Sequence, residues 1–463
     1  MEGMMEKVII GGGQGFWGDS PDAAIHMVRN SNINYMACDY LAELTLSIMA
    51  RQKLKNPNAG YARDFLGMMN EVMLDAKNRN IRILTNAGGM NIEGCVAALQ
   101  KMAREKGVRE YKLGYVTGDD MTGKIDDLMK QGVSMDNIDG EVDGISDFSQ
   151  IKDKIVNANV YFGHEPTLAC LEQGADVVVT GRSTDSALFL APIMHELKWK
   201  ADDWTQLARG IMVGHLLECG GQGAGGNFDY AWRQVPRMDE LGFPIAEISN
   251  DDFYITKAPD CGGLISEQSC KEQFLYEVHD PANYVTPDVV VDISKAKITQ
   301  NGDQRVRVEN IFGKQRPDML KLSIGYHAGY KVAGMLSFAW PDAYEKAQYA
   351  AEILKKKMKR LGIHPRDILI SYIGLNALHL GVADMSSERV RDINEVVLRI
   401  AIRTDTKEEC AKLIPEIAPL QLNGPPGASF FGGRAHVQEV IGLWPTLIPR
   451  DCVDLKSHIV AIN

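Results

Sequence analysis

The stretch VIIGGGQGFWGDSPDAA, residues 8–24, decides the fold class. Its apolar start at 8–10 predicts a strand, and a run of glycines follows. Ser20, Pro21 and Asp22 then predict a helix start, with Ser as the N-cap, Pro at the first position and an acid in the first turn. A strand, a glycine loop and a helix in this order predict the first unit of an alternating α/β fold.

The same order of elements recurs through the first half of the chain. Further strands are predicted at 33–39, 81–89, 111–120, 157–166 and 175–185, with helical spacing of apolar residues between them. This alternation predicts an N-terminal doubly wound, mainly parallel sheet over residues 1–280. After the Pro- and Asp-rich stretch at 278–288, longer alternating segments such as EVVLRIAIR (395–403) predict a C-terminal α+β domain over 281–463.

Composition excludes several classes of partner. The chain has 463 residues, a formal net charge of −11 and no block of Lys and Arg, which argues against nucleic acid and anionic membranes. No apolar stretch approaches the roughly 20 residues of a membrane span. The acidic start MEGMMEKVII lacks the features of a signal peptide, and eight cysteines without a C-x-x-C pair predict reduced thiols. We therefore expect a cytoplasmic protein.

Polar residues gather where the predicted strands end. They are Gly13, Gly15 and Asp19; Asp39 and Glu43; Asn86; Asp119 and Asp120; His164; and Arg182, Thr184 and Asp185. Ligands of open parallel sheets bind beyond the carboxyl ends of the strands. Turns and caps also favour Asp, Asn and Gly, which gives most single residues an ordinary structural explanation. His164 and Arg182 are not typical capping residues, so the edge as a whole predicts a binding site.

The glycines of the opening stretch match a dinucleotide fingerprint. Gly13, Gly15 and Gly18 have the G-x-G-x-x-G spacing, and Asp39 lies about 20 residues further on. Against a dinucleotide, the helix starts only after Gly18, and the carboxylate of Asp19 would repel a pyrophosphate. A loop that lets the backbone approach a ligand while it presents Asp19 suits the order better.

Two further stretches carry reactive side chains. In GHLLECGGQGAGGNF (214–228), His215, Glu218 and Cys219 share a helix face, and Gln222 follows. They could bind a divalent metal, supply an acid–base pair, or simply pack at a helix end. In NGPPGASFFGGRAH (423–436), Arg434 could hold a carboxylate or serve in domain docking. The sequence contains no G-x-S-x-G elbow and no Walker A loop.

These stretches together resemble one known family, the acyclic terpene utilisation (AtuA-type) family. The matching segments, which run from about residue 7 to 453, include GGGQGFWGDSPDAA, ILTNAGGMN, VTGDD, GADVVVTGRSTDSALFLAP, GHLLECGGQGAGGNF, LKLSIGYHAGY and NGPPGASFFGGRAHVQEVIGLWPTLIPR. Family members often carry an acid where Cys38 stands and a Val where Ser183 stands. The resemblance implies a role in catabolism through CoA thioesters, and a small companion domain or subunit.

The residues lead to one main hypothesis and two alternatives. The main hypothesis is a hydro-lyase or hydrolase acting on an acyl-CoA or a branched or poly-carboxylate substrate. Its catalytic residues are Asp119, Asp120, His164, His215 and Glu218, and its substrate-binding residues are Gly13, Gly15, Asp19, Asn86, Arg182, Thr184, Asp185, Gln222 and Arg434. Crowding of adjacent Asp119 and Asp120 would raise one pKa and make a usable acid.

The alternatives are a non-catalytic binding or assembly subunit that works with the companion, and a nicotinamide-dependent oxidoreductase. No cofactor is predicted, and a divalent metal is left open. The long strands of the second domain favour a homo-oligomer.

Overall fold

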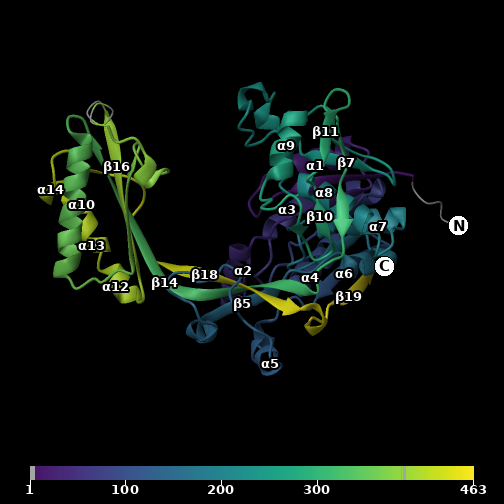
Figure 1. The fold of residues 1–463 in the computed structure, drawn as a ribbon, viewed down its shortest axis with the longest axis horizontal. Coiled ribbons are helices and arrows are strands. Elements are labelled where there is room, and N and C mark those ends of the chain that lie inside the picture. Colours follow the sequence, from purple (N-terminus) through teal and green to yellow (C-terminus); the bar gives the residue numbers. More distant parts are fainter. Residues whose placement is uncertain (1–5, 387, 389, 391–392) are drawn as a thin grey trace. The chain divides into compact units, whose positions relative to one another are not determined.

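The computed structural model describes residues 6–386, 388, 390 and 393–463, so the first five residues of the chain lie outside it. The chain divides into two compact units, Met1–Gly325 with Leu443–Asn463 and Tyr326–Gly442 (Figure 1). This division differs from the boundary expected near residue 280. Residues 281–325 and 443–463 belong to the first unit because strands from both segments join its main sheet.

The first unit is built on a mixed sheet of ten strands. Their order is β11 (Lys297–Gln300), β12 (Val306–Glu309), β8 (Phe253–Lys257), β7 (Pro244–Ile248), β1 (Val8–Gln14), β2 (Tyr35–Cys38), β3 (Arg82–Thr85), β6 (Val177–Val179), β4 (Tyr111–Thr117) and β19 (Lys456–Ile462). The pairs from β1 through β2, β3 and β6 to β4 are parallel. The outer pairs are antiparallel. The sheet thus has a parallel centre and antiparallel sides.

One predicted strand does not belong to this sheet. The segment expected at 157–166 forms β5 (Ile155–Val160), which pairs with β14 (Met319–Ala339) instead. An isolated parallel bridge between Phe162 and Ser183 still holds the end of this segment beside the loop after β6. The polar strand ends therefore come from five parallel strands and one neighbouring segment.

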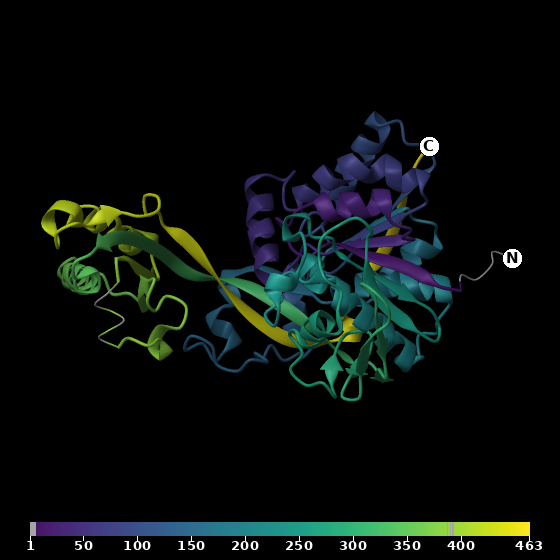
Figure 2. The same cartoon turned by 90° about the horizontal axis from the view of Figure 1, so that it is seen from above.

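Helices cover both faces of the main sheet. α1 (Asp22–Asn30), α3 (Arg63–Asn78) and α4 (Ile92–Glu105) contribute to one apolar cluster, and α6 (Glu165–Glu172), α7 (Ala187–Leu197) and α8 (Trp204–Leu217) to the other. Alternate residues of β2 divide between the clusters, since side chains of a strand point to opposite faces. Figure 2 shows the purple and blue helices on one side of the strands and teal helices on the other. α1 begins at Asp22, with Pro21 and not Ser20 at the N-cap position.

The second unit has its own sheet and core. The strands β15 (Asp367–Ile373), β16 (Glu395–Thr404), β14 and β17 (Ser429–Phe430) pair in this order, and each of these pairs is antiparallel. β18 (Gln438–Pro449) also pairs with β14. α10 (Ala343–Arg360) and α12 (Lys407–Ala411), α13 (Ile414–Ile417) and α14 (Leu420–Asn423) bury apolar side chains against this sheet. In the described part of the chain, no helix combines the length and the apolar character needed to cross a membrane.

Candidate functional site

The first unit contains two adjoining cavities at the loops that follow the parallel strands. The polar cavity, of about 720 Å³, is lined among others by Asp39, Glu43, Arg182, Asp185 and Glu218. The acidic cavity, of about 860 Å³, is lined among others by Asp19, Asp22, Asp239, Glu240 and Asp260. Gly15, Phe16, Cys219 and Tyr276 line both cavities and form the wall between them.

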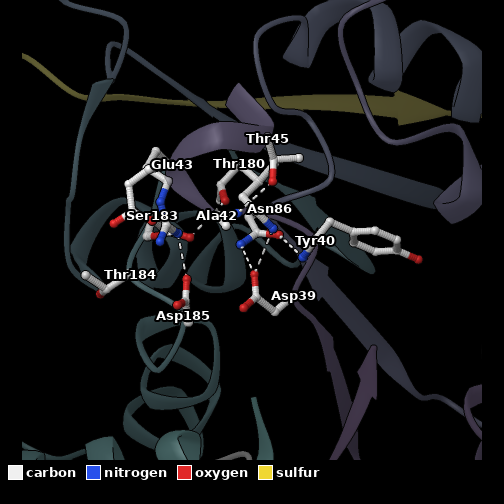
Figure 3. A network of polar contacts seen from close by, with 12 residues as sticks. Asp39, Tyr40, Ala42, Glu43, Thr45, Asn86, Thr180, Ser183, Thr184 and Asp185 are labelled. Carbon is white, nitrogen blue, oxygen red and sulfur yellow. Dashed lines mark hydrogen bonds and ion pairs between the residues drawn. The ribbon is translucent and has the colours of Figure 1, made fainter. Parts of the chain in front are cut away.

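Asp39 is the buried carboxyl of the polar cavity. It follows β2, where one of its oxygens, Oδ1, accepts hydrogen bonds from the side-chain amide of Asn86 and from the Leu41 amide at 3.1 Å (Figure 3). Asn86 in turn accepts from the Tyr40 amide at 2.7 Å, which fixes its orientation. Burial and the negative charge of Asp185 raise the pKa of Asp39 well above its usual range. Burial therefore favours the protonated form of Asp39 more than that of an exposed aspartate.

Arg182 is the buried cation of the cavity and is 3% exposed. Its Nη1 donates to the Ser183 carbonyl at 2.8 Å and to Asp185 Oδ1 at 2.6 Å. Its guanidinium carbon lies 4.0 Å from the centroid of the Tyr161 ring. Burial opposes the positive charge, but the carboxylate of Asp185 outweighs it and raises the pKa of Arg182. The guanidinium is thus a fixed positive group.

Glu43 and Lys321 form a second charged pair at the same tyrosine. Lys321 Nζ donates to Glu43 Oε1 at 3.0 Å and lies 4.7 Å from the Tyr161 ring centroid. Burial would raise the pKa of Glu43, but the Tyr161 hydroxyl and the charges of Arg182 and Lys321 outweigh burial and lower it to about 2. Glu43 is therefore ionised at neutral pH, whereas the pKa of Asp39 in the same cavity is shifted in the opposite direction.

His215 and Glu218 meet at the C-terminal end of α8. His215 Nδ1 lies 3.2 Å from Glu218 Oε1, and burial raises the pKa of Glu218. Glu218 lines the polar cavity, while His215 lies behind it, against Tyr284. Burial also raises the pKa of neighbouring Cys219 to about 12, so this thiol is not ionised at neutral pH.

The glycine loop is explained by close packing of the backbone. A Cβ at Gly12 would lie 2.4 Å from the Leu217 carbonyl oxygen, and one at Gly15 would lie 2.6 Å from the carbonyl carbon of Cys219. At Gly13 a Cβ would meet Cys38 Sγ at 2.6 Å. The Gly15 amide donates to Asp19 Oδ2 at 3.0 Å. Gly12 and Gly15 thus let β1 and its loop pass directly against the end of α8, and Gly13 lets β1 pack against β2, without any need for a phosphate.

The model of the family described as acyclic terpene utilisation family protein AtuA matches residues 8–459. The chain belongs to this family. No curated protein and no solved structure matches it. Family membership thus covers both units of the chain, while the roles of the residues in this AtuA-family protein rest on its own geometry.

The AtuA-family protein places most of the predicted binding residues in the two cavities. Arg182, Thr184 and Asp185 line the polar cavity, Asp19 and Gln222 line the acidic cavity, and Gly15 lines both. Gln222 is held there by Gln273, to which its amide donates at 3.0 Å. Gly13 and Asn86 support the wall from behind, as described above.

Besides His215, three of the predicted catalytic residues line neither cavity. Asp119 is buried and accepts hydrogen bonds from the Arg182 amide at 2.9 Å and from Asn159 at 3.1 Å. Burial raises its pKa to about 6, and the neighbouring charge of Asp120 is a lesser cause. Asp120 is exposed and accepts from the amide and hydroxyl of Thr122. The geometry of Asp119 suits it to hold the loop after β6, and that of Asp120 suits it to start the turn at 122–124.

His164 is the third of these residues, and it forms a buried ion pair. Its Nδ1 lies 2.7 Å from Asp288 Oδ1, and its backbone amide donates to the same oxygen at 3.0 Å. The charge of Asp288 outweighs burial and raises the pKa of His164. The pair ties the start of α6 to the segment before β10 (Val290–Asp292). Arg434 is exposed in the second unit and lines neither cavity.

Two functional candidates were not anticipated from the sequence. Tyr161 follows β5 and Lys321 lies on β14, so their approach depends on the pairing of those two strands. The signal that could have indicated Lys321 is its position in LKLSIGYHAGY, because this segment is one of those that resemble the family. For the described residues, no group of three or more His, Cys, Asp or Glu side chains is arranged to hold a metal ion.

Proposed function

We propose that this AtuA-family protein is an acid–base enzyme, a hydro-lyase in the first place, acting on a carboxylate or acyl-CoA substrate. The observation that carries the proposal is Asp39, a buried carboxyl with one oxygen held by two donors, in a cavity that also holds Arg182 and Lys321. In this proposal, the five parallel strands and the helices on both of their faces form a doubly wound sheet. Ligands of such sheets bind at the carboxyl ends of the strands, where Asp39 lies.

The roles follow from the charge state of each group. Asp39 would give its proton to a departing hydroxyl group, which leaves as water. Glu218, backed by His215, would take the proton from the carbon next to the substrate carbonyl. Arg182 and Lys321 would hold the negative group of the substrate. A hydro-lyase needs an acid and a base but no nucleophile, which agrees with the protonated state of the Cys219 thiol.

The first test is Asp39→Asn. Asparagine keeps the shape and the accepting oxygen but cannot transfer a proton, so we expect kcat to fall by about 10²–10⁴-fold. The measurement is turnover of carboxylates and acyl-CoAs followed by loss or gain of a carbon–carbon double bond. The melting temperature of the variant is measured in parallel, to show that it is folded.

Asp120→Asn is the matched control. It makes the same chemical change in an exposed carboxyl that lines neither cavity, so we expect wild-type turnover. Full activity of Asp39→Asn, or equal loss in the two variants, would contradict the assignment of Asp39 as the acid.

A further inference from the structure

Two cations of the polar cavity contact the same tyrosine ring. Arg182 and Lys321 both stand at the ring of Tyr161, 4.0 and 4.7 Å from its centroid. Arg182 Nε is buried and lacks a hydrogen-bond partner in the described residues. A buried donor without a partner costs free energy unless a ligand satisfies it. The two cations Arg182 and Lys321 therefore mark a position for an anionic group of a ligand.

The room for negative charge at this position is small. Arg182 already faces Asp185, and Lys321 already faces Glu43. In the described lining of the polar cavity, Arg182 and Lys321 are the Lys and Arg side chains present. Two cations that each already contact a carboxylate suit one further carboxylate, not the several charges of a nucleotide.

The acidic cavity makes a nucleotide still less favourable. A ligand that extends past Gly15, Phe16, Cys219 and Tyr276 enters this cavity. Its described lining carries the carboxyls of Asp19, Asp22, Asp239, Glu240 and Asp260 and no Lys or Arg. Phosphate groups there would meet these like charges, of which Glu240 is paired with Arg237. The neighbouring space thus repels the phosphates of CoA and of nicotinamide dinucleotides.

We infer that the substrate is a small free carboxylic acid, whose carboxylate is bound by Arg182 and Lys321, and not a CoA thioester. This inference rests on the proposed function, which it narrows to one of the two substrate classes. The apolar side chains Leu41, Met319, Leu320 and Leu447 line the same cavity and would pack against the carbon skeleton of such an acid. Lys321 is then a specificity-determining residue as well as a binding one.

The test compares matched free acids and thioesters on the full chain. The probes are crotonate, 3-hydroxybutyrate, succinate and malate, the CoA thioesters of the same acids, and CoA and NADH alone. Binding is measured by titration calorimetry and by the shift in melting temperature, and turnover of each acid and thioester is followed in parallel. We expect at least one free acid to bind at least tenfold more tightly than its thioester, and no binding of CoA or NADH.

Lys321→Gln tests the position of the carboxylate. Loss of one charge-assisted hydrogen bond should weaken acid binding by about tenfold or more. Lys101→Gln is the control, because Lys101 also faces a glutamate, Glu105, but on the exposed surface of α4. We expect it to bind acids as the wild type does.

Each outcome decides the inference. Binding and turnover of a thioester at least as effective as that of its free acid would overturn it and leave the proposed acid–base function standing. If neither Lys321→Gln nor Lys101→Gln changes the affinity for acids, the assignment of Lys321 as a ligand of the substrate carboxylate is overturned. No binding by any acid or thioester at about 20 mM, a concentration at which even weak specific binding is detected, would overturn it together with the proposed function.

Discussion

Burial and nearby cations shift the pKa values of the carboxyl groups of this protein in opposite directions. Asp39, Asp119 and Glu218 are desolvated, and each has a raised pKa. Glu43 is also partly buried, but it faces two cations and its pKa is lowered to about 2. Pairs of carboxyls pushed apart in pKa are the usual arrangement for acid and base roles. The distribution is therefore as informative about function as the residue types themselves.

Asp119 gives a prediction about stability and pH. Its pKa of about 6 lies above the ordinary value of 3.8, so the folded state holds this proton at a pH where the unfolded state has released it. The contribution of Asp119 to the free energy of unfolding is fully present below about pH 4. It is lost as the pH rises to about 6 and above. Between pH 4 and 7 the loss is roughly 2 kcal/mol of unfolding free energy.

Asp119→Asn should remove this dependence. Urea unfolding at pH 4.5, 6 and 7.5 should show a smaller decline in the variant than in the wild type, because the amide keeps an accepting oxygen and does not titrate. Asp120→Asn, at the exposed neighbour, should follow the wild-type curve. A variant curve parallel to that of the wild type would show that Asp119 is not protonated in the folded state.

The residues of the site divide into those that local sequence could indicate and those that it could not. Arg182, Asp185 and Asp39 follow strands with clear apolar patterns, so the edge they occupy was predictable. Asp119 and Asp120 also follow a strand. Asp120 accepts a hydrogen bond from Thr122 in the turn that follows, whereas Asp119 points into the interior and accepts from the Arg182 amide. The direction of a side chain at a strand end depends on the loop that follows, and no pattern in the sequence reports it.

Among the elements, β1 and α8 are joined by a contact that only glycine permits. Gly12 lies in β1, where a Cβ would approach the Leu217 carbonyl oxygen to 2.4 Å. Leu217 is the last residue of α8, immediately before Glu218 and Cys219. Packing at this distance leaves no room for a methyl group, so the helix end and the cavity wall depend on this one glycine.

Gly12→Ala should therefore destabilise the protein by about 1–3 kcal/mol and reduce activity, because the end of α8 must shift. The control is Gly67→Ala in the exposed face of α3, where a Cβ meets nothing within 4 Å. That change should stabilise by about 0.5–1 kcal/mol, since alanine favours helix more than glycine does. Unfolding free energy and turnover of both variants check the pair. Equal effects of the two changes would contradict the packing argument.

The elements that the sequence predicted well are those formed by neighbours in the chain. The strand–helix alternation through α8 is present at nearly the expected positions. The pairing of β5 with β14, and of β4 with β19, joins segments far apart in the sequence. Such pairings are selected by tertiary packing and not by local pattern, which is why the antiparallel sides of the sheet and the position of Lys321 were not predicted.

At the scale of the whole molecule, the chain has separate cores. The apolar clusters on the two faces of the main sheet belong to the first unit, and the cluster around α10 and β16 belongs to the second. The expected boundary near residue 280 followed a change in local composition. The observed boundaries instead fall within β14 and β18, so each of these two strands contributes residues to both units. Separate cores are the condition for units that open separately.

Leu354→Ala tests this separation. Leu354 is fully buried in α10, so the truncation should cost about 2–5 kcal/mol in the second unit. Hydrogen exchange measured by mass spectrometry should then show faster exchange in α10 and β16, with the strands β1, β2, β3 and β6 and the binding of ligands to the polar cavity unchanged. Leu99→Ala makes the same truncation at a fully buried residue of α4 in the first unit, and should give the reverse pattern. Faster exchange in both units from either change would mean that the two cores unfold as one, and the polar cavity would then depend on the second unit for its stability.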